Sequence, residues 1–217
     1  MKNNLLPIAK EGWNYVIGSV VAFLVFTLFN FDFLEFFSFL AMLFFLFVFR
    51  NPEREHLLYQ EESVVAPVDG TVASIEEIAD DGYIGYRVII ESSYLNVGLL
   101  RVPFTATIEE VASKKGARLS GLSPLADALN EQTEVVFSDK KSLNKLKVIH
   151  KLKQSFAPLS IDAIVNQSMM QGGRYGLMVN GTTTLCLPKN FRLNVSIGSE
   201  LVASETLVGY FTSELKK

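Results

Sequence analysis

The chain has 217 residues, of which 49% are hydrophobic and 20% charged, and its formal net charge is -3. This composition excludes a disordered chain and a collagen-like repeat, and the small negative charge provides no electrostatic attraction to nucleic acid. A disulfide framework or a zinc site needs more ligands than one cysteine and two histidines supply, so no metal is expected from Cys186, His56 and His150.

The first fifty residues differ in composition from the rest of the chain. Twelve of the 17 phenylalanines lie there, and between Gly12 and Phe49 the only charged side chains are Asp32 and Glu35. Two apolar runs, at about 13–30 and 33–49, each approach the ~20 residues that a helix needs to cross a bilayer. We therefore predict a transmembrane α-hairpin within residues 1–50. The alternative is an apolar helical hairpin buried in a soluble protein.

The positions of the cations predict the orientation of this hairpin. Lys2 and Lys10 precede the first apolar run, Arg50 and Arg54 follow the second, and the turn between the runs carries only acids. Because lysine and arginine near membrane spans stay on the cytoplasmic side, both ends should face the cytoplasm. The expectation is a multi-pass protein of the inner (cytoplasmic) membrane with a cytoplasmic C-terminal domain.

After the apolar runs the composition becomes ordinary, and residues 51–62 read as a polar, proline-containing linker. From residue 63 to 217 short β-branched runs alternate with glycine-containing turns, which is typical of strands. The predicted strands are 64–65, 71–75, 86–91, 106–111, 133–137, 147–151, 192–198, 201–202 and 206–209. Residues 122–131 fit a short helix or an ordered loop, and residues 159–170 fit a helix capped by Ser160. The predicted fold is a transmembrane α-hairpin followed by a mainly β (α+β) domain with barrel-sandwich-like character.

Several short motifs follow one another in a characteristic order. They are Pro7–Trp13 before the first apolar run, Phe49–Arg54 after the second, Ala66–Gly70, Asn130–Gln132 and Gly172–Gly176. In this order they resemble the short, membrane-anchored form of the phosphatidylserine decarboxylase family, over nearly the whole chain. The resemblance implies a carboxy-lyase of phospholipid biosynthesis that acts on a membrane phospholipid.

The resemblance also implies how the cofactor is made. Members of this family cut their own backbone at a Gly-Ser bond and convert the serine into a pyruvoyl group, which accepts electrons as carbon dioxide leaves. The matching bond here joins Gly181 to Thr182, so self-cleavage would leave a pyruvoyl-type (2-oxoacyl) group with one extra methyl. Asp69 matches the aspartate that assists the hydroxyl, and the family's histidine is replaced by Gly98. Asp69, Gly181 and Thr182 are thus the expected catalytic residues.

Other readings of these residues stay open. Asp69 before a glycine also favours a plain turn, and Thr182 could be a strand residue after an Asn180–Gly181 hairpin turn. Arg101 and Arg174 are candidates to bind the lipid phosphate, with surface salt bridges as the alternative. The two replacements also fit a catalytically silent relative that binds lipid or a partner, and a membrane-tethered β adaptor needs only the hairpin and the strands. Self-association stays open as well.

Overall fold

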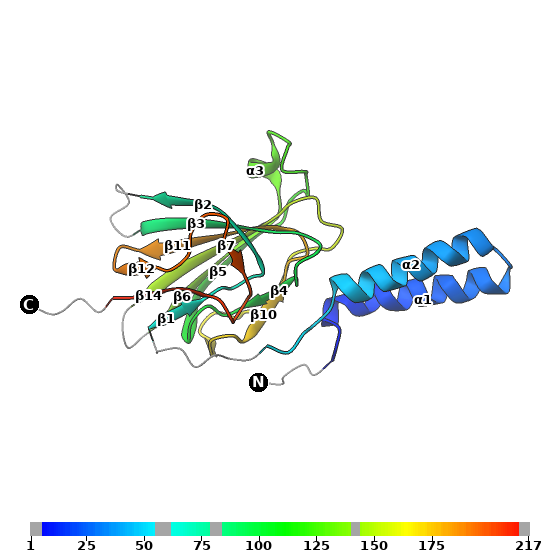
Figure 1. Ribbon diagram of the computed structural model, residues 1–217, viewed down its shortest axis with the longest axis horizontal. Helices are drawn as coiled ribbons and strands as arrows, with labels where there is room; N and C mark the ends of the chain where they lie inside the picture. The colour runs from blue at the N-terminus through cyan, green and yellow to red at the C-terminus, as the bar shows by residue number, and fades with distance from the viewer. Residues whose placement is uncertain (1–5, 55–61, 79–83, 140–143, 213–217) are drawn as a thin grey trace, which may run out of the picture. The chain divides into compact units, whose positions relative to one another are not determined.

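The computed structural model describes residues 6–54, 62–78, 84–139 and 144–212 (Figure 1). The chain forms two compact units, Met1–Glu53 and Arg54–Lys217. Most of the expected linker, residues 55–61 with His56, lies outside the described residues.

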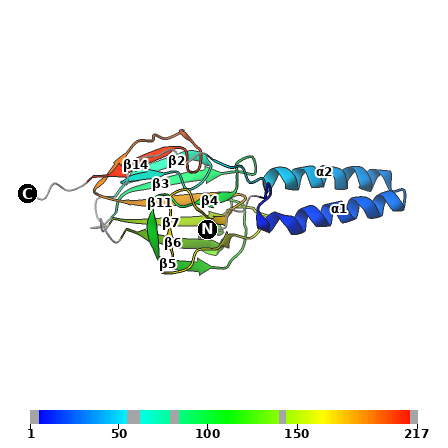
Figure 2. The same cartoon turned by 90° about the horizontal axis from the view of Figure 1, so that it is seen from below.

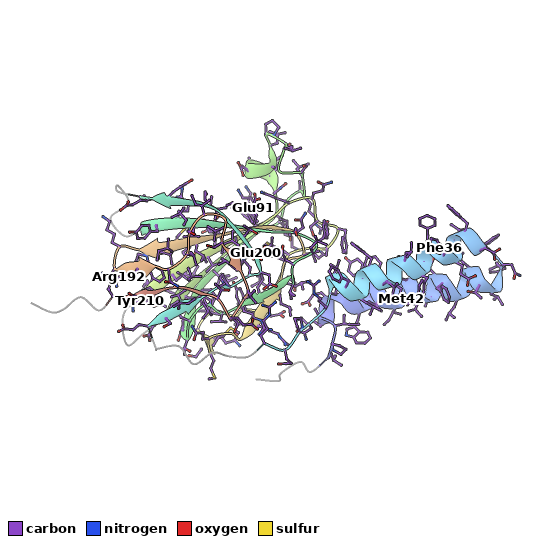
Figure 3. All side chains as sticks on the ribbon, viewed as in Figure 1. Phe36, Met42, Glu91, Arg192, Glu200 and Tyr210 are labelled. Atoms are coloured by element: carbon purple, nitrogen blue, oxygen red, sulfur yellow. The ribbon has the colours of Figure 1, made fainter. Side chains whose placement is uncertain are left out.

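The first unit consists of a short 3-10 turn, η1 (Lys10–Gly12), and two helices, α1 (Trp13–Leu28) and α2 (Asp32–Val48). The helices pack along each other through aromatic rings, with the ring centroids of Phe23 and Phe39 6.2 Å apart. Other large side chains stay exposed, and Phe36 points away from the helix pair (Figure 3).

One helix of this unit is suited to cross a membrane. Among the described residues, Lys10–Leu28 alone is long and apolar enough by length and composition, while α2 has 17 residues. The described residues thus contain one helix, near the N-terminus, that is long and apolar enough to cross a bilayer. The second crossing and the cytoplasmic orientation stay predictions.

The second unit is mainly β, and its described residues form three antiparallel sheets. The largest sheet has the order β13 (Glu200–Leu201), β2 (Gly70–Glu77), β3 (Ile84–Ser92), β11 (Gly181–Pro188), β7 (Lys145–Leu152), β6 (Gln132–Ser138), β5 (Ala106–Lys114) and β9 (Ser168–Met169). A second sheet has the order β1 (Ser63–Val65), β14 (Leu207–Phe211) and β12 (Phe191–Leu193), and a third β4 (Leu99–Arg101), β10 (Arg174–Leu177) and β8 (Ser160–Ile161).

Alternating side chains explain why the large sheet has one buried face. In β7, Leu146, Val148, His150 and Leu152 are fully buried, whereas the alternate residues Lys147, Ile149 and Lys151 are partly exposed. Because successive side chains of a strand point to opposite faces, this alternation sends one row into the core and leaves the other in solvent. Figure 2 shows β2, β3, β11, β7, β6 and β5 side by side, with β11 near the middle.

The core of this unit is shared by all three sheets. Buried residues from each sheet form one cluster, exemplified by Val64, Leu100, Val148, Leu185 and Phe211. No closed barrel is found among the described residues, so the predicted barrel-sandwich character is not confirmed. The confirmed part of the predicted fold class is a mainly β domain preceded by an apolar helix.

The predicted helix over residues 159–170 is wrong. The segment contains the short strands β8 and β9, which pair with β10 and β5 respectively. Asn166 adopts a left-handed backbone conformation with a φ of 68°, which interrupts a right-handed helix. Hydrogen bonds to neighbouring strands replace the helical ones. Within residues 122–131, the helical part is a single turn, α3 (Ala126–Leu129).

Candidate functional site

The expected cleavage bond lies at the start of β11, in the middle of the large sheet. Gly181 pairs with Ser92 on β3 and with Leu152 on β7, and Thr182 pairs with Glu91 and Lys151 on the same two strands. The preceding strand, β10, belongs to another sheet, so Asn180 and Gly181 do not form the predicted hairpin turn. Thr182 is a strand residue, held on both sides by neighbouring strands.

The side chain of Thr182 lies on the solvent side of the sheet. It lines an open groove of about 500 Å³, together with Thr184. Thr183, between them, is fully buried. The alternation of β11 thus presents the hydroxyl of Thr182 to solvent.

Gly181 is required by packing. A β-carbon at this position would collide with the carbonyl oxygen of Lys151 and would lie 2.8 Å from Sδ of Met178. Any larger residue would therefore push β11 away from β7. This steric demand accounts for glycine here independently of any role in self-cleavage.

The carboxylate of Asp69 is buried and fully engaged. Its Oδ2 accepts a hydrogen bond from Nη2 of Arg54 at 2.6 Å and one from the Val97 backbone N–H at 3.3 Å, and Oδ1 accepts from the Ala203 N–H at 2.8 Å. The side chains of Asp69 and Arg54 are 11% and 8% exposed. The carboxylate thus links three segments that are distant in sequence, those of Arg54, Val97 and Ala203.

The backbone of Asp69 nevertheless lies close to the expected cleavage bond. Ser92 donates a hydrogen bond from its hydroxyl to the Asp69 carbonyl oxygen at 2.5 Å, and Ser92 is the strand partner of Gly181. The turn that carries Asp69 and the start of β11 therefore belong to one neighbourhood.

Gly98, which replaces the expected histidine, also lies in this neighbourhood. Its carbonyl oxygen accepts a hydrogen bond from the Met178 N–H at 2.7 Å. A β-carbon on Gly98 would lie 2.9 Å from the Met178 carbonyl oxygen and 3.3 Å from Cα of Val179. The backbone that leads into β11 thus occupies the space in which a histidine side chain would begin.

This packing predicts that restoring the histidine does not restore an active arrangement. We expect Gly98→Ala to lower the free energy of unfolding by about 1–3 kcal/mol, because an added carbon overpacks the site. Gly98→His should cost at least as much and should not promote self-cleavage. Urea titration followed by circular dichroism measures the first effect, and intact mass measures the second. Gly121→Ala is the control, since the nearest atoms to its β-carbon would belong to the flexible Lys153 side chain, at 3.3 Å.

The two arginines predicted to bind phosphate lie outside the groove. Arg101 on β4 and Arg174 on β10 lie opposite each other in the pairing of these two strands. Arg101 is 3% exposed and donates from Nη1 to the Gly172 carbonyl oxygen at 3.1 Å. The structure therefore gives Arg101 an interior contact and does not bring either arginine to Thr182. Their binding of phosphate stays a prediction.

A buried polar network lies next to Thr182, and its residues were not among those predicted for the site. Nδ1 of His150 lies 2.8 Å from the Thr183 hydroxyl, and its Nε2 lies 2.6 Å from the Tyr175 hydroxyl. All three residues are fully buried. Burial lowers the pKa of His150 to about 3 and raises the pKa of Tyr175, so both groups are neutral at physiological pH.

This network had a signal in the sequence. Lys147 and Lys151 must face solvent, so the alternation along β7 sends His150 into the core with Val148. A neutral imidazole between two hydroxyls satisfies every polar group of the network, which fixes the inner face of β11 opposite Thr182.

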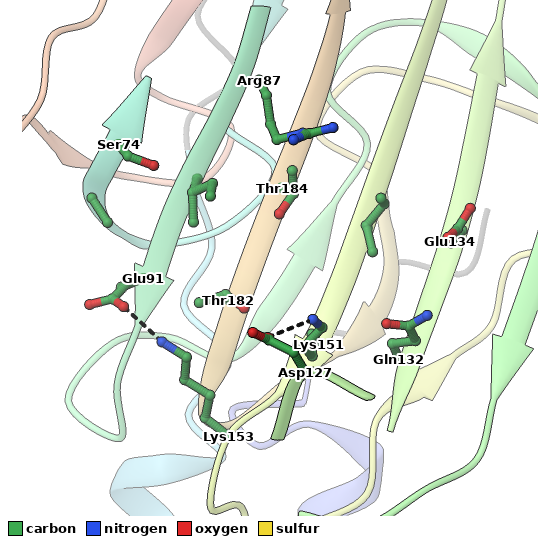
Figure 4. Close-up of a pocket in the computed structure, with 13 residues that line it drawn as sticks. Ser74, Arg87, Glu91, Asp127, Gln132, Glu134, Lys151, Lys153, Thr182 and Thr184 are labelled. Atoms are coloured by element: carbon green, nitrogen blue, oxygen red, sulfur yellow. Dashed lines mark hydrogen bonds and ion pairs between the residues drawn. The ribbon is translucent and has the colours of Figure 1, made fainter. Parts of the chain in front are cut away.

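Charged side chains surround Thr182 on the groove face (Figure 4). Nζ of Lys153 lies 2.7 Å from Oε1 of Glu91, and Nζ of Lys151 lies 3.0 Å from Oδ1 of Asp127. Across the part of the chain that the structure describes, no group of three or more histidine, cysteine or acidic residues could hold a metal ion. The groove is therefore a polar surface with both signs of charge around the Thr182 hydroxyl.

Comparisons with known proteins give the class of this chain. The family profile described as Phosphatidylserine decarboxylase matches residues 41–209. The phosphatidylserine decarboxylase proenzyme of Geobacter metallireducens is 30% identical over 96% of this chain and 99% of its own length. That of Geotalea daltonii is 29% identical over 98% and 100%, and that of Chlorobium phaeobacteroides 30% identical over 77% and 79%.

The family match covers more than half of the chain and the first of these relatives is 30% identical over 96% of it, so the sequence falls in a family of phospholipid decarboxylases. The chain belongs to the phosphatidylserine decarboxylase family. This confirms the resemblance drawn from the ordered motifs.

Proposed function

We propose that the protein decarboxylates a membrane phospholipid with a phosphoserine headgroup, through a 2-oxoacyl group made by cutting its own Gly181–Thr182 bond. Family membership supports the reaction class. The observation that carries the assignment is the position of Thr182. This residue follows Gly181 at the start of β11, and its side chain lines an open groove.

The steps of self-cleavage need only this chain and water. The Thr182 hydroxyl oxygen attacks the Gly181 carbonyl carbon, and the peptide C–N bond breaks to leave an ester and a free amine. Loss of the Thr182 Cα proton and cleavage of its Cβ–O bond release the Gly181 carboxylate. Water then hydrolyses the remaining enamine, through its imine form, to a 2-oxobutanoyl end and ammonia. Asp69 is the proposed base that assists the attacking hydroxyl. Its carboxylate must leave Arg54 before it can reach the Thr182 hydroxyl.

The groove has room for the resulting group. Thr182 opens onto a volume of about 500 Å³, so a keto group at residue 182 would meet solvent and substrate. When present, a 2-oxoacyl group supplies a carbonyl that accepts electrons as an α-amino acid loses carbon dioxide. The chain's own contribution is to hold that position rigidly between β3 and β7.

The membrane helix would bring this site to its substrate. We propose that both helices of the first unit cross the inner membrane, with the β domain in the cytoplasm. A tethered domain meets lipid headgroups at a far higher effective concentration than a free one.

The intact mass of the purified full chain tests the proposal. We expect two polypeptides, residues 1–181 and a fragment 182–217 with a blocked, carbonyl-bearing end. Thr182→Ala should leave one uncut chain because the attacking hydroxyl is lost, whereas Thr184→Ala, on the same face of the same strand, should cut normally. Thr182→Ser should cut and give a fragment end smaller by one methylene group. An uncut parent chain, or a cut that persists in Thr182→Ala, contradicts the proposal.

A second candidate is a catalytically silent family member that binds lipid or a partner. The observations that favour it are the engaged carboxylate of Asp69 and the backbone packed against Gly98. A single uncut chain in the same mass measurement is its expected result.

A further inference from the structure

The large sheet places an acid and a base on either side of Thr182. Glu91 on β3 and Lys151 on β7 are its two direct strand partners. Neighbouring strands lie about 4.8 Å apart, so the two charges begin about 10 Å from each other across the hydroxyl. Figure 4 shows the side chains of all three residues on the groove face.

A second cation is fixed beside this row by the backbone. The Lys153 N–H donates to the Asn180 carbonyl oxygen at 3.1 Å, and Nδ2 of Asn180 donates to the Lys153 carbonyl oxygen at 2.8 Å. Lys153 is therefore tied to the residue just before Gly181. Its ammonium reaches Glu91, so Glu91, Lys151 and Lys153 lie beside Thr182. The groove is also lined by Asp127, which pairs with Lys151, and by Arg87 and Glu134.

The ion pairs in the groove are exposed enough to exchange with a ligand. Glu91 and Lys153 are 57% and 33% exposed, and in the other pair Asp127 is 95% exposed. Such pairs contribute only about 0–1 kcal/mol each in water. A ligand that offers the same charges can replace Lys153 at Glu91, and Asp127 at Lys151, at little cost.

We propose that this groove binds a phosphoserine-type headgroup, with Glu91 accepting the ammonium and Lys151 and Lys153 binding the carboxylate and the phosphate. The assignment rests on the proposed function, because it places the amine beside residue 182. Once Lys153 leaves Glu91 and Asp127 leaves Lys151, Glu91 can meet the one ammonium, and Lys151 and Lys153 can meet the two anionic groups. The volume of about 500 Å³ lies within the usual range for small-molecule sites, about 300–1,000 Å³.

Headgroup binding by the full chain in detergent micelles tests this assignment. The probes are O-phospho-L-serine, O-phosphoethanolamine, which lacks the carboxylate, and dihexanoyl phosphatidylserine, each titrated by calorimetry. We expect Glu91→Gln and Lys151→Gln to weaken binding of the serine probes at least about tenfold, since hydrogen bonds to charged groups are among the stronger ones. O-Phosphoethanolamine should bind the parent less tightly than O-phospho-L-serine, and Lys151→Gln should reduce that difference.

An exposed ion pair outside the groove provides matched controls. Lys145 and Glu109 lie 2.7 Å apart with 41% and 46% of their side chains exposed. Glu109→Gln and Lys145→Gln should bind all probes as the parent does. If they weaken binding as much as the groove variants, or if no serine probe binds the parent, the assignment is wrong. Binding by the lipid probe alone identifies the lipid headgroup as the ligand, and binding by the free amino acid alone identifies a soluble one.

The same titration on Thr182→Ala separates this inference from the proposed function. Serine probes that bind both the parent and this variant, with neither chain cut, support the groove assignment while overturning self-cleavage. A parent that cuts at residue 182 but binds no serine probe gives the reverse result.

Discussion

Asp69→Asn is expected to lower the free energy of unfolding by about 3–5 kcal/mol, because it leaves the buried guanidinium of Arg54 without its countercharge. The pair is nearly closed to solvent, at 8% and 11% side-chain exposure, and the carboxylate also accepts two backbone hydrogen bonds. An amide can keep the shape of the side chain but not the charge. Urea titration of the uncut and cut forms measures the effect separately from any catalytic role.

An exposed acid provides the control for this change. Glu109→Gln removes one partner of a surface ion pair and should cost no more than about 1 kcal/mol. A double variant, Arg54→Met with Asp69→Asn, should be more stable than the sum of the two single changes predicts, since the residues contact each other. If Asp69→Asn costs no more than Glu109→Gln, the carboxylate is not a structural link.

The stability of the domain should fall in acid because of His150. Its pKa is about 3 in the folded protein against 6.5 in an unfolded chain, as a result of burial. Between these values the unfolded chain binds a proton that the folded chain does not, so stability rises with pH and is lost as the pH falls below 6.5. The expected loss from pH 7 to pH 4 is about 3 kcal/mol from this residue.

A variant without the titrating group isolates this contribution. His150→Gln should show a dependence on pH that is flatter by that amount. Urea titrations at pH 7, 6, 5 and 4 measure both proteins. Equal slopes for His150→Gln and the parent would show that His150 titrates normally in the folded state.

Local patterns in the sequence predicted most of the strands. The six runs expected between residues 64 and 151 correspond to β1, β2, β3, β5, β6 and β7. They were predictable because alternation along a strand records which face is buried, and this depends on neighbouring residues only. Residues 159–170 were mispredicted because β8 and β9 exist through pairing with distant strands, which leaves little trace in the local sequence.

The site was predictable only in part for a related reason. The ordered motifs located Gly181 and Thr182, but the partner of Asp69 is an arginine of the predicted linker, and no spacing rule connects the two. The contact between Gly98 and Met178 is likewise a long-range approach of two backbones. The charged row around Thr182 depends on the register between β3, β11 and β7, which composition does not give.

The ion pair between Arg54 and Asp69 also sets where a soluble form of the domain can begin. Strand composition alone suggests starting at Ser63, beyond the polar segment. A chain that began at Ser63 would bury Asp69 without its countercharge, in the turn whose carbonyl oxygen is bound by Ser92. A chain that starts before Arg54 retains the counterion. The N-terminal boundary of the β unit is therefore set by the ion pair of Arg54 with Asp69 and not by the start of the first strand.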